Sequence, residues 1–285
     1  MEVVHTSRTI TSSDGTTIGY HQLGDGPGLI LLSGGYLAAQ HYMELARALS
    51  HAFTVYVPDR RGRGLSGPPG PRYCMARECE DVTALVAETG ARLLFGHSSG
   101  GLIALQASLA LPAVEKIAVY EPALSMYGTF SMSWIPRFER ELRQGRLGAA
   151  MVTFSKGVQA DRKVDLLPRW LLVPMIDLFL RRRPKASRSG EQPLSELIPL
   201  QRLDVQIFQE MSTSEGFAAL TAQVLLMEGA GTPPPLRRAL DALQATLPHA
   251  RRITFPGVGH EAPVGRRGAP GRVADTLRMF FTESN

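Results

Sequence analysis

Ser98 lies at the centre of Gly96-His97-Ser98-Ser99-Gly100, a spacing of glycine and serine that can present a nucleophile. The apolar run 91–95 precedes it and the helix-favouring residues 102–107 follow, which predicts a strand that turns directly into a helix. Glycines at both ends would let the two elements approach closely and expose the Ser98 hydroxyl beside the N–H groups of the helix N-terminus. The pattern predicts nucleophilic catalysis by Ser98, with an ordinary glycine and serine turn as the alternative.

The composition is that of an ordinary globular protein. The chain has 285 residues, of which 44% are hydrophobic and 20% charged, enough for one large core carrying an insertion. The first residues lack a basic segment followed by an apolar one, and no apolar run reaches the length of a membrane span. We therefore expect no secretory signal, no transmembrane segment and a cytoplasmic location.

The charges and cysteines argue against nucleic-acid binding, a disulfide and a metal site. The net charge of +5 comes from arginines scattered along the chain, so nucleic-acid binding is not expected, and the one basic cluster, 181–185, is typical of a solvated helix end. Cys74 and Cys79 lie five residues apart in a helical segment, which disfavours a disulfide. No histidine near them completes a zinc site, and nothing in the chain indicates a metal or an organic cofactor.

Strands and helices alternate in the first half of the chain. Two alternating runs, 8–11 and 16–21, flank the turn 13–15 and predict a hairpin. Further strands are predicted at 28–32, 53–59, 91–95 and 114–121, with helices at 40–50, 75–88 and after Ser98. This alternation is typical of a mostly parallel, doubly wound α/β sheet.

The pattern changes between Tyr127 and Thr221, where helical pieces are broken by prolines and no strand is evident. Strands return at 223–228 and 252–255, separated by a helix at 236–247, and a helix through 274–281 closes the chain. We therefore predict a core of residues 1–122 and 222–285, with a helical cap, residues 123–221, inserted between the sixth and seventh strands.

Four motifs, each at the end of a predicted strand, resemble the α/β-hydrolase fold over nearly the whole chain. They are Ser33-Gly34-Gly35, the segment 59–66 (DRRGRGLS), the Ser98 pentapeptide and Gly257-Val258-Gly259-His260. In open α/β sheets, the carboxyl edge of the strands is where ligands bind. The resemblance is to the serine branch of the superfamily, which contains esterases, lipases and thioesterases; Ser98 disfavours the branches that use an aspartate nucleophile, the dehalogenases and epoxide hydrolases.

The resemblance implies roles for residues around Ser98. His260 would be the general base, and the backbone N–H groups of Ser99 and Gly35 would form the oxyanion hole, with Tyr36 as the alternative to Gly35. Ser33 stands where the family often has histidine, which leaves a backbone donor intact. His97 adjoins Ser98, but neighbours on a sharp turn point apart, so we expect it to pack beneath the end of the sheet.

The third member of a Ser-His-acid triad is the weakest part of the resemblance. The acid usually follows the strand after the cap, where this chain has Gly231 in the position expected for aspartate. Some α/β hydrolases place the acid after the preceding strand, and Glu121 ends that strand at the correct edge. Glu121 is therefore the predicted acid and Glu228 the alternative, and a Ser-His pair without a strong third partner stays open.

The cap should cover the substrate pocket, which we expect to be lined by Tyr36, His97, Tyr127 and Trp134. The most apolar stretch of the cap, 170–180, is followed by the basic cluster. The sequence does not choose among a lid over an apolar substrate, a contact in a homodimer and interfacial lipid binding.

These observations favour a serine hydrolase that cleaves an ester, thioester or lactone of a small apolar substrate through an acyl-enzyme on Ser98. A second interpretation keeps the Ser98–His260 pair but assigns acyl transfer, cyclisation or lyase chemistry on a natural-product-like substrate, because pocket and water access decide the acceptor. A third, made plausible by Ser33 and Gly231, is a ligand-binding protein without catalysis.

Overall fold

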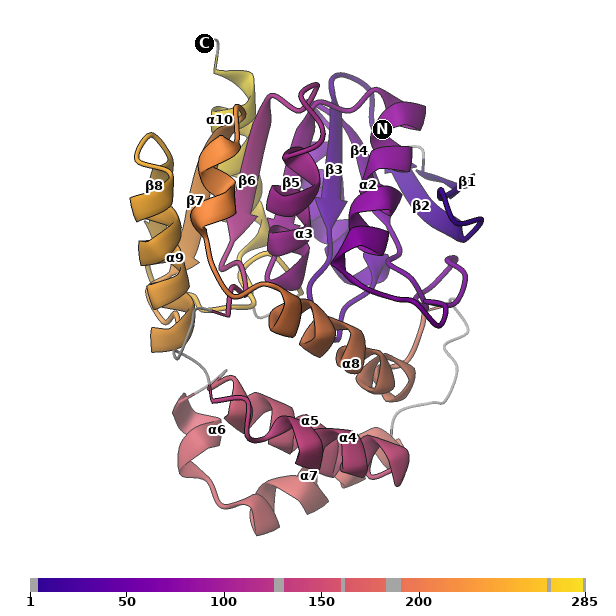
Figure 1. Ribbon diagram of the computed structural model, residues 1–285, viewed down its shortest axis with the longest axis vertical. Helices are drawn as coiled ribbons and strands as arrows, with labels where there is room; N and C mark the ends of the chain where they lie inside the picture. Colours follow the sequence, from indigo (N-terminus) through magenta and orange to yellow (C-terminus); the bar gives the residue numbers. More distant parts are fainter. Residues whose placement is uncertain (1–4, 126–130, 160–161, 183–190, 266–267, 284–285) are drawn as a thin grey trace.

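The computed structural model describes residues 5–125, 131–159, 162–182, 191–265 and 268–283. Eight strands form one sheet in the order β1-β2-β4-β3-β5-β6-β7-β8 (Figure 1). The strands are β1 (His5–Thr11), β2 (Thr17–Leu23), β3 (Gly28–Leu32), β4 (Thr54–Pro58), β5 (Leu93–His97), β6 (Lys116–Tyr120), β7 (Gln223–Gly229) and β8 (Arg251–Phe255). Only β2 runs antiparallel to its neighbours, so the predicted mostly parallel sheet is confirmed.

The parallel strands are buried because helices cover both faces of the sheet (Figure 1). On one face, α2 (Met75–Thr89), α3 (Ser99–Ser108) and α9 (Pro234–Thr246) contribute side chains to a core cluster that includes Ile103 and Leu240. On the other face, α1 (Met43–Leu49) and α10 (Pro270–Thr282) pack together over a second cluster that includes Leu45 and Phe281. A short 3₁₀ helix, η1 (Ala39–Tyr42), leads into α1.

The register of three central strands aligns their carboxyl ends. His97 at the end of β5 lies opposite Tyr120 at the end of β6, and Tyr120 lies opposite Met227 of β7. The residues that follow these strands, Ser98, Glu121 and the segment after Met227, therefore emerge at one edge of the sheet.

The chain between β6 and β7 forms helices that lie beyond this edge (Figure 1). They are α4 (Ile135–Arg143), α5 (Leu147–Gly157), α6 (Arg162–Leu166), α7 (Arg169–Arg182), α8 (Leu194–Glu210) and η2 (Glu215–Ala219), and no described residue of this segment belongs to a strand. Helix α8 lies between the sheet and the other cap helices, and it contacts α2 and α3 of the core as well as α4 and α5. The division into a core and a cap of residues 123–221 stays a prediction. Helix α8 lies within the predicted cap in sequence, yet it contacts helices of both parts.

The observed bounds of the elements differ from the predicted ones by a few residues at their ends. The strand before Ser98 begins at Leu93 and runs through His97, and α3 begins at Ser99. None of the helices in the described ranges combines the length and the hydrophobicity that spanning a bilayer requires.

Buried ion pairs connect the loop after β4 to the cap. Arg60 binds Glu78 of α2 with contacts of 2.9 and 3.1 Å and Asp204 of α8 at 2.7 Å. Arg63 binds the other oxygen of Asp204 at 2.8 Å, and the Asp204 side chain is fully buried. Burial raises the pKa of Asp204, but the two arginines outweigh burial and hold this pKa below its ordinary value.

Asp204→Asn should destabilise the fold, because it leaves Arg60 and Arg63 buried with less compensating charge. Removing one partner of a buried ion pair costs about 3–5 kcal/mol. The measurement is the free energy of unfolding from urea titration. Asp275→Asn is the matched control: Asp275 pairs with Arg278 at an exposed site, and its change should stay within about 0.5 kcal/mol. Equal effects of the two variants would contradict the role given to Asp204.

Candidate active site

Ser98 occupies a strained turn between β5 and α3. Its backbone has φ 55° and ψ −121°, a conformation that L residues rarely adopt outside over-determined sites. The turn is held by hydrogen bonds from the Ser98 N–H to the Tyr120 carbonyl at 2.9 Å and from the Gly101 N–H to the Ser98 carbonyl at 2.9 Å. A Cβ atom on Gly96 would clash with the Gly100 carbonyl, and one on Gly100 with the Leu32 carbonyl. Both glycines are needed for the close approach that the sequence predicted.

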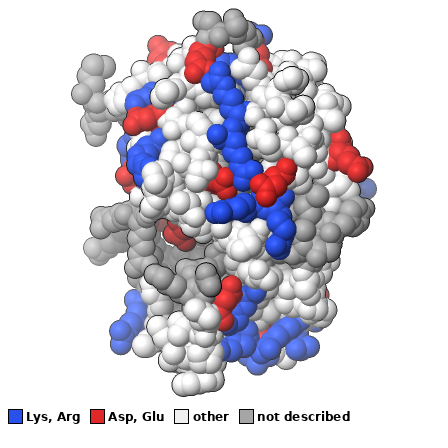
Figure 2. Space-filling model, turned by 90° about the vertical axis from the view of Figure 1, so that its left-hand side faces the viewer, with Lys and Arg blue, Asp and Glu red and all other residues white. Residues whose placement is uncertain are grey.

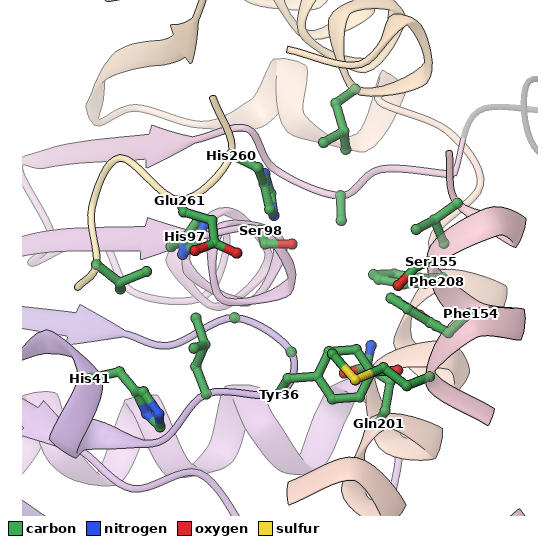
Figure 3. Close-up of a pocket in the computed structure, with 18 of the residues that line it drawn as sticks. Tyr36, His41, His97, Ser98, Phe154, Ser155, Gln201, Phe208, His260 and Glu261 are labelled. Atoms are coloured by element: carbon green, nitrogen blue, oxygen red, sulfur yellow. The ribbon is translucent and has the colours of Figure 1, made fainter. Parts of the chain in front are cut away.

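Glu121 and His260 meet at the same edge of the sheet. His260 Nδ1 lies 2.7 Å from Glu121 Oε2, and in Figure 3 the His260 ring points toward Ser98. In neutral imidazole, the nitrogen that faces a carboxylate carries the proton, which leaves Nε2 as the acceptor. The structure thus brings together the three residues that the sequence singled out as a triad.

The Glu121 carboxylate is fully buried and receives three donors. Besides His260, it accepts hydrogen bonds from the Gly229 N–H at 2.9 Å and from the Thr232 hydroxyl. Burial raises the pKa of Glu121, but these donors outweigh it and hold the pKa below its ordinary value. Glu121 is therefore ionised at neutral pH.

Gly231 does not leave a gap where the usual acid is missing. Its N–H donates to the Val258 carbonyl at 3.1 Å, so the turn after β7 packs on the loop that carries His260. The Tyr120 hydroxyl donates to the next carbonyl of that loop, Gly259, at 2.8 Å. These contacts fix the backbone on which His260 stands.

Glu228, the alternative acid, is not brought to His260. Its carboxylate lies 2.9 Å from Arg252 Nε and 3.7 Å from Arg237 Nε, and it accepts from the Thr254 hydroxyl at 3.1 Å. Side chains two residues apart on a strand point to the same face, and Leu226 lies in the core cluster with α9, so Glu228 points to that face and contacts Arg252 of β8 and Arg237 of α9. The structure contradicts Glu228 as the third member of the triad.

His97 is buried beneath the loop after β3, as its sequence position indicated. Its Nδ1 shares a 2.7 Å hydrogen bond with the Tyr42 hydroxyl, and its ring centroid lies 4.6 Å from that of His260. Burial and the neighbouring His260 hold the pKa of His97 well below its ordinary value. His97 is therefore neutral and also lines the cavity described below.

The loop after β3 and the start of α3 supply backbone donors around Ser98. The Gly34 N–H donates to the Tyr42 hydroxyl at 3.1 Å, which engages that donor and leaves the N–H groups of Gly35 and Tyr36 as the candidates from this loop. A Cβ atom on Gly34 would lie 3.0 Å from Ser98 Cβ, which shows how closely the loop approaches the serine. Tyr36 has a positive φ of 57°, so the loop is sharply bent here.

Helix α8 contacts both segments that carry these donors. Ser99 Oγ donates to Asp204 Oδ1 at 2.6 Å, and Arg60 Nη1 donates to Ser99 Oγ at 3.1 Å. One turn earlier on α8, the Gln201 carboxamide covers Gly35 so closely that a Cβ atom there would clash with it. Gln201 and Asp204 lie three residues apart and hence on one face of the helix.

A cavity of about 620 Å³ lies between this edge and the cap (Figure 3). Ser98, His260, His97 and Tyr36 line it on the core side, and Phe154, Phe208 and Trp134 are among its apolar cap residues. The structure thereby places three of the four expected pocket residues at the cavity, while Tyr127 lies outside the described residues. Gln201, Ser125 and Ser155 add polar atoms that the sequence did not reveal.

The two cysteines take no part in the site. Both are free thiols, Cys74 directly before α2 and Cys79 within it, and burial raises the pKa of Cys79 to about 12, so its thiolate is not populated near neutral pH. No group of three His, Cys, Asp or Glu side chains within the described ranges is arranged to hold a metal ion.

Sequence comparisons agree with the geometry. Residues 29–276 match the model of the Alpha/beta hydrolase family. A pimeloyl-[acyl-carrier protein] methyl ester esterase from Xanthomonas campestris pv. campestris (strain B100) is 25% identical over 264 residues, covering 90% of this chain and 96% of the relative. The N-formylmaleamate deformylase of Pseudomonas putida is 32% identical over 160 residues, covering 52% of this chain and 58% of that enzyme.

Among solved structures, an alpha/beta hydrolase from Sphaerobacter thermophilus DSM 20745 superposes with a TM-score of 0.78 at 28% identity, covering 96% of this chain and 100% of that one. The family match and these relatives support an esterase-like enzyme. The chain belongs to the alpha/beta hydrolase family.

Proposed function

We propose that the protein is a serine hydrolase that cleaves a carboxylic ester, thioester or lactone of a small apolar substrate through an acyl-enzyme on Ser98. The observation that supports this most directly is the 2.7 Å contact between His260 and the buried Glu121, with the imidazole ring turned toward a serine on a strained turn. This is the arrangement in which an imidazole can take the serine proton.

In acylation, Ser98 Oγ attacks the substrate carbonyl carbon while its proton passes to His260 Nε2. The imidazolium then donates that proton to the departing alcohol or thiol, and the carbon–oxygen or carbon–sulfur bond breaks. Glu121 keeps the imidazole in the required tautomer and stabilises its positive charge. In deacylation, water attacks the acyl carbon and gives a proton to His260, which passes it to Ser98 Oγ as the bond between Oγ and the acyl carbon breaks and the carboxylic acid leaves.

The negative charge of the tetrahedral intermediate would be met by the backbone N–H groups of Ser99 and Gly35. Such donors are effective because they are fixed before the charge develops, and one of them contributes about 3 kcal/mol of transition-state stabilisation. The contacts of α8 with Ser99 and Gly35 keep these two segments in place, which makes Asp204 and Gln201 positioning residues.

The cavity favours an uncharged acyl group with an apolar body. No lysine or arginine is among its described lining residues, so a free carboxylate would have no cation to pair with. Gln201 Oε1, Tyr36 Oη and Trp134 Nε1 are buried there without a hydrogen-bond partner in the described part of the chain. A substrate with a hydrogen-bonding group beyond the scissile carbonyl would satisfy such atoms.

A fluorophosphonate probe tests for an activated serine. We expect rapid labelling of the wild type and none of Ser98→Ala or His260→Ala, because the first removes the nucleophile and the second removes its base. Ser7→Ala and His249→Ala, both at exposed positions, are the matched controls and should label like the wild type. A folded wild-type protein that is not labelled would favour ligand binding without catalysis. Labelling without hydrolysis of any ester would favour acyl transfer or lyase chemistry.

Glu121→Gln should lower kcat by roughly a thousandfold or more, because an amide cannot stabilise the imidazolium and favours the wrong tautomer. The measurement is steady-state hydrolysis of an ester, with the melting temperature of each variant recorded. Glu228→Gln is the matched control, since Glu228 binds Arg252 away from the site, and its kcat should stay within about threefold of the wild type. The assignment fails if the two variants lose the same activity.

Ser99→Ala should lower kcat by about tenfold with little change in KM, because it releases the α3 N-terminus from Asp204 while keeping the backbone N–H. Ser108→Ala, at the other end of α3, removes a buried hydroxyl that donates to the Ala104 carbonyl at 2.7 Å. Its kcat should not change. A rise in KM with constant kcat in Ser99→Ala would show that Ser99 serves substrate binding instead.

A further inference from the structure

The outer face of the cap is strongly apolar. Between Val164 and Arg182, eleven side chains are exposed, of which nine are apolar, two are arginine and none is acidic or neutral polar. We call the nine the apolar cap face: Leu166, Leu167, Pro168, Trp170, Leu171, Pro174, Met175, Leu178 and Phe179. Seven of the ten large hydrophobic side chains that are exposed in the described chain belong to it.

Helix α7 is apolar on its outward side as well as on its inward side, where Leu172 is buried and Val173, Ile176 and Leu180 are partly buried. Trp170 is 76% exposed and Met175 57%, whereas Leu172 is the one buried side chain of the helix. Its acidic residue, Asp177, is turned inward and lies against Gly148 of α5. Water is a poor partner for such a face, and an exposed apolar patch of this kind marks a docking surface.

Positive charge is concentrated in the same part of the chain. Residues 135–182 hold ten Lys and Arg against five Asp and Glu. This excess equals the net charge of +5 of the whole chain, so the remaining residues together carry no net charge. Figure 2 shows basic side chains on both sides of the uncharged lower end of the molecule, which is the cap. Arg181 and Arg182 stand at the end of α7 and are exposed.

We propose that the apolar cap face docks on an anionic lipid surface. Apolar side chains would enter the boundary between headgroups and acyl chains, Trp170 would lie at that boundary, and Arg181 and Arg182 would pair with lipid phosphates. A second copy of the chain fits less well. In a two-fold symmetric dimer, the apolar cap face of one copy would contact the same face of the other copy. Because this segment exposes arginines and no acid, the arginines would then have no charged partner.

This surface adjoins the cavity, because Phe179 belongs to the apolar cap face and also lines the cavity wall. Docking would therefore place the cap side of the cavity next to the lipid. The inference itself depends only on the cap surface and not on the chemistry proposed for Ser98.

Co-sedimentation with vesicles tests the proposal. The full chain should sediment with phosphatidylglycerol vesicles and at least tenfold less with phosphatidylcholine vesicles, and high salt should weaken the binding. Trp170→Ser and Leu178→Ser should each lower the affinity by about tenfold or more, and the double variant Arg181→Ala/Arg182→Ala by roughly thirtyfold. Met279→Ser is the matched control: Met279 is 67% exposed on α10, outside the face, and its loss should change nothing.

Tryptophan fluorescence gives a second measurement. Trp170 should shift to shorter wavelength when phosphatidylglycerol is added, and Trp170→Phe should lose this shift while it still binds. Unchanged melting temperatures would show that the variants are folded. Absence of vesicle binding, or binding that Trp170→Ser leaves intact, overturns the proposal. A wild-type dimer that Trp170→Ser converts to a monomer, with no vesicle binding, would assign the face to a second copy instead.

Discussion

The hydrogen bonds of the buried Glu121 carboxylate join three segments that are far apart in the sequence. They connect the end of β6 to the last residue of β7, through Gly229, to the turn after β7, through Thr232, and to the loop after β8, through His260. A buried carboxylate without donors would be unstable as an anion, so the three segments must stay together for it to remain ionised. Because the pKa of Glu121 is lower in the fold, its contribution to stability is present above its unfolded pKa and is lost as the pH falls through the folded value.

A second set of contacts makes the cap part of the site. Asp204 of α8 binds Ser99, Arg60 and Arg63, and Gln201 lies on Gly35, so one face of a cap helix rests on both sides of Ser98. Burying this much charge gains little net stability compared with apolar packing. Its effect is geometric, since charged hydrogen bonds fix the distance between α8 and the start of α3 more narrowly than apolar contacts would.

The sequence predicted those parts of the molecule in which local constraints decide the structure. The Ser98 turn was predictable because only glycine fits at 96 and 100, and the parallel strands because their apolar runs end in turns. The acid was harder, since Gly231 removes the usual signal and only the position of Glu121 at the end of a strand remained. Thr232, Asp204 and Gln201 carry no local signal at all, because their roles arise from contacts between segments as distant as Ser99 and Asp204.

Helix α7 packs against α5 but buries few of its own side chains. Leu172 is its one buried side chain, and Arg169 attaches its first turn through hydrogen bonds to Glu141 and Thr153, at 2.6 Å each. Elements with little buried apolar surface open at low free-energy cost, so α7 should be among the less stable parts of the cap. A partner that covers the apolar cap face would therefore order this helix as it binds. Since Phe179 also lines the cavity, ordering α7 would complete the cavity wall, and occupation of the outer face would favour substrate binding inside.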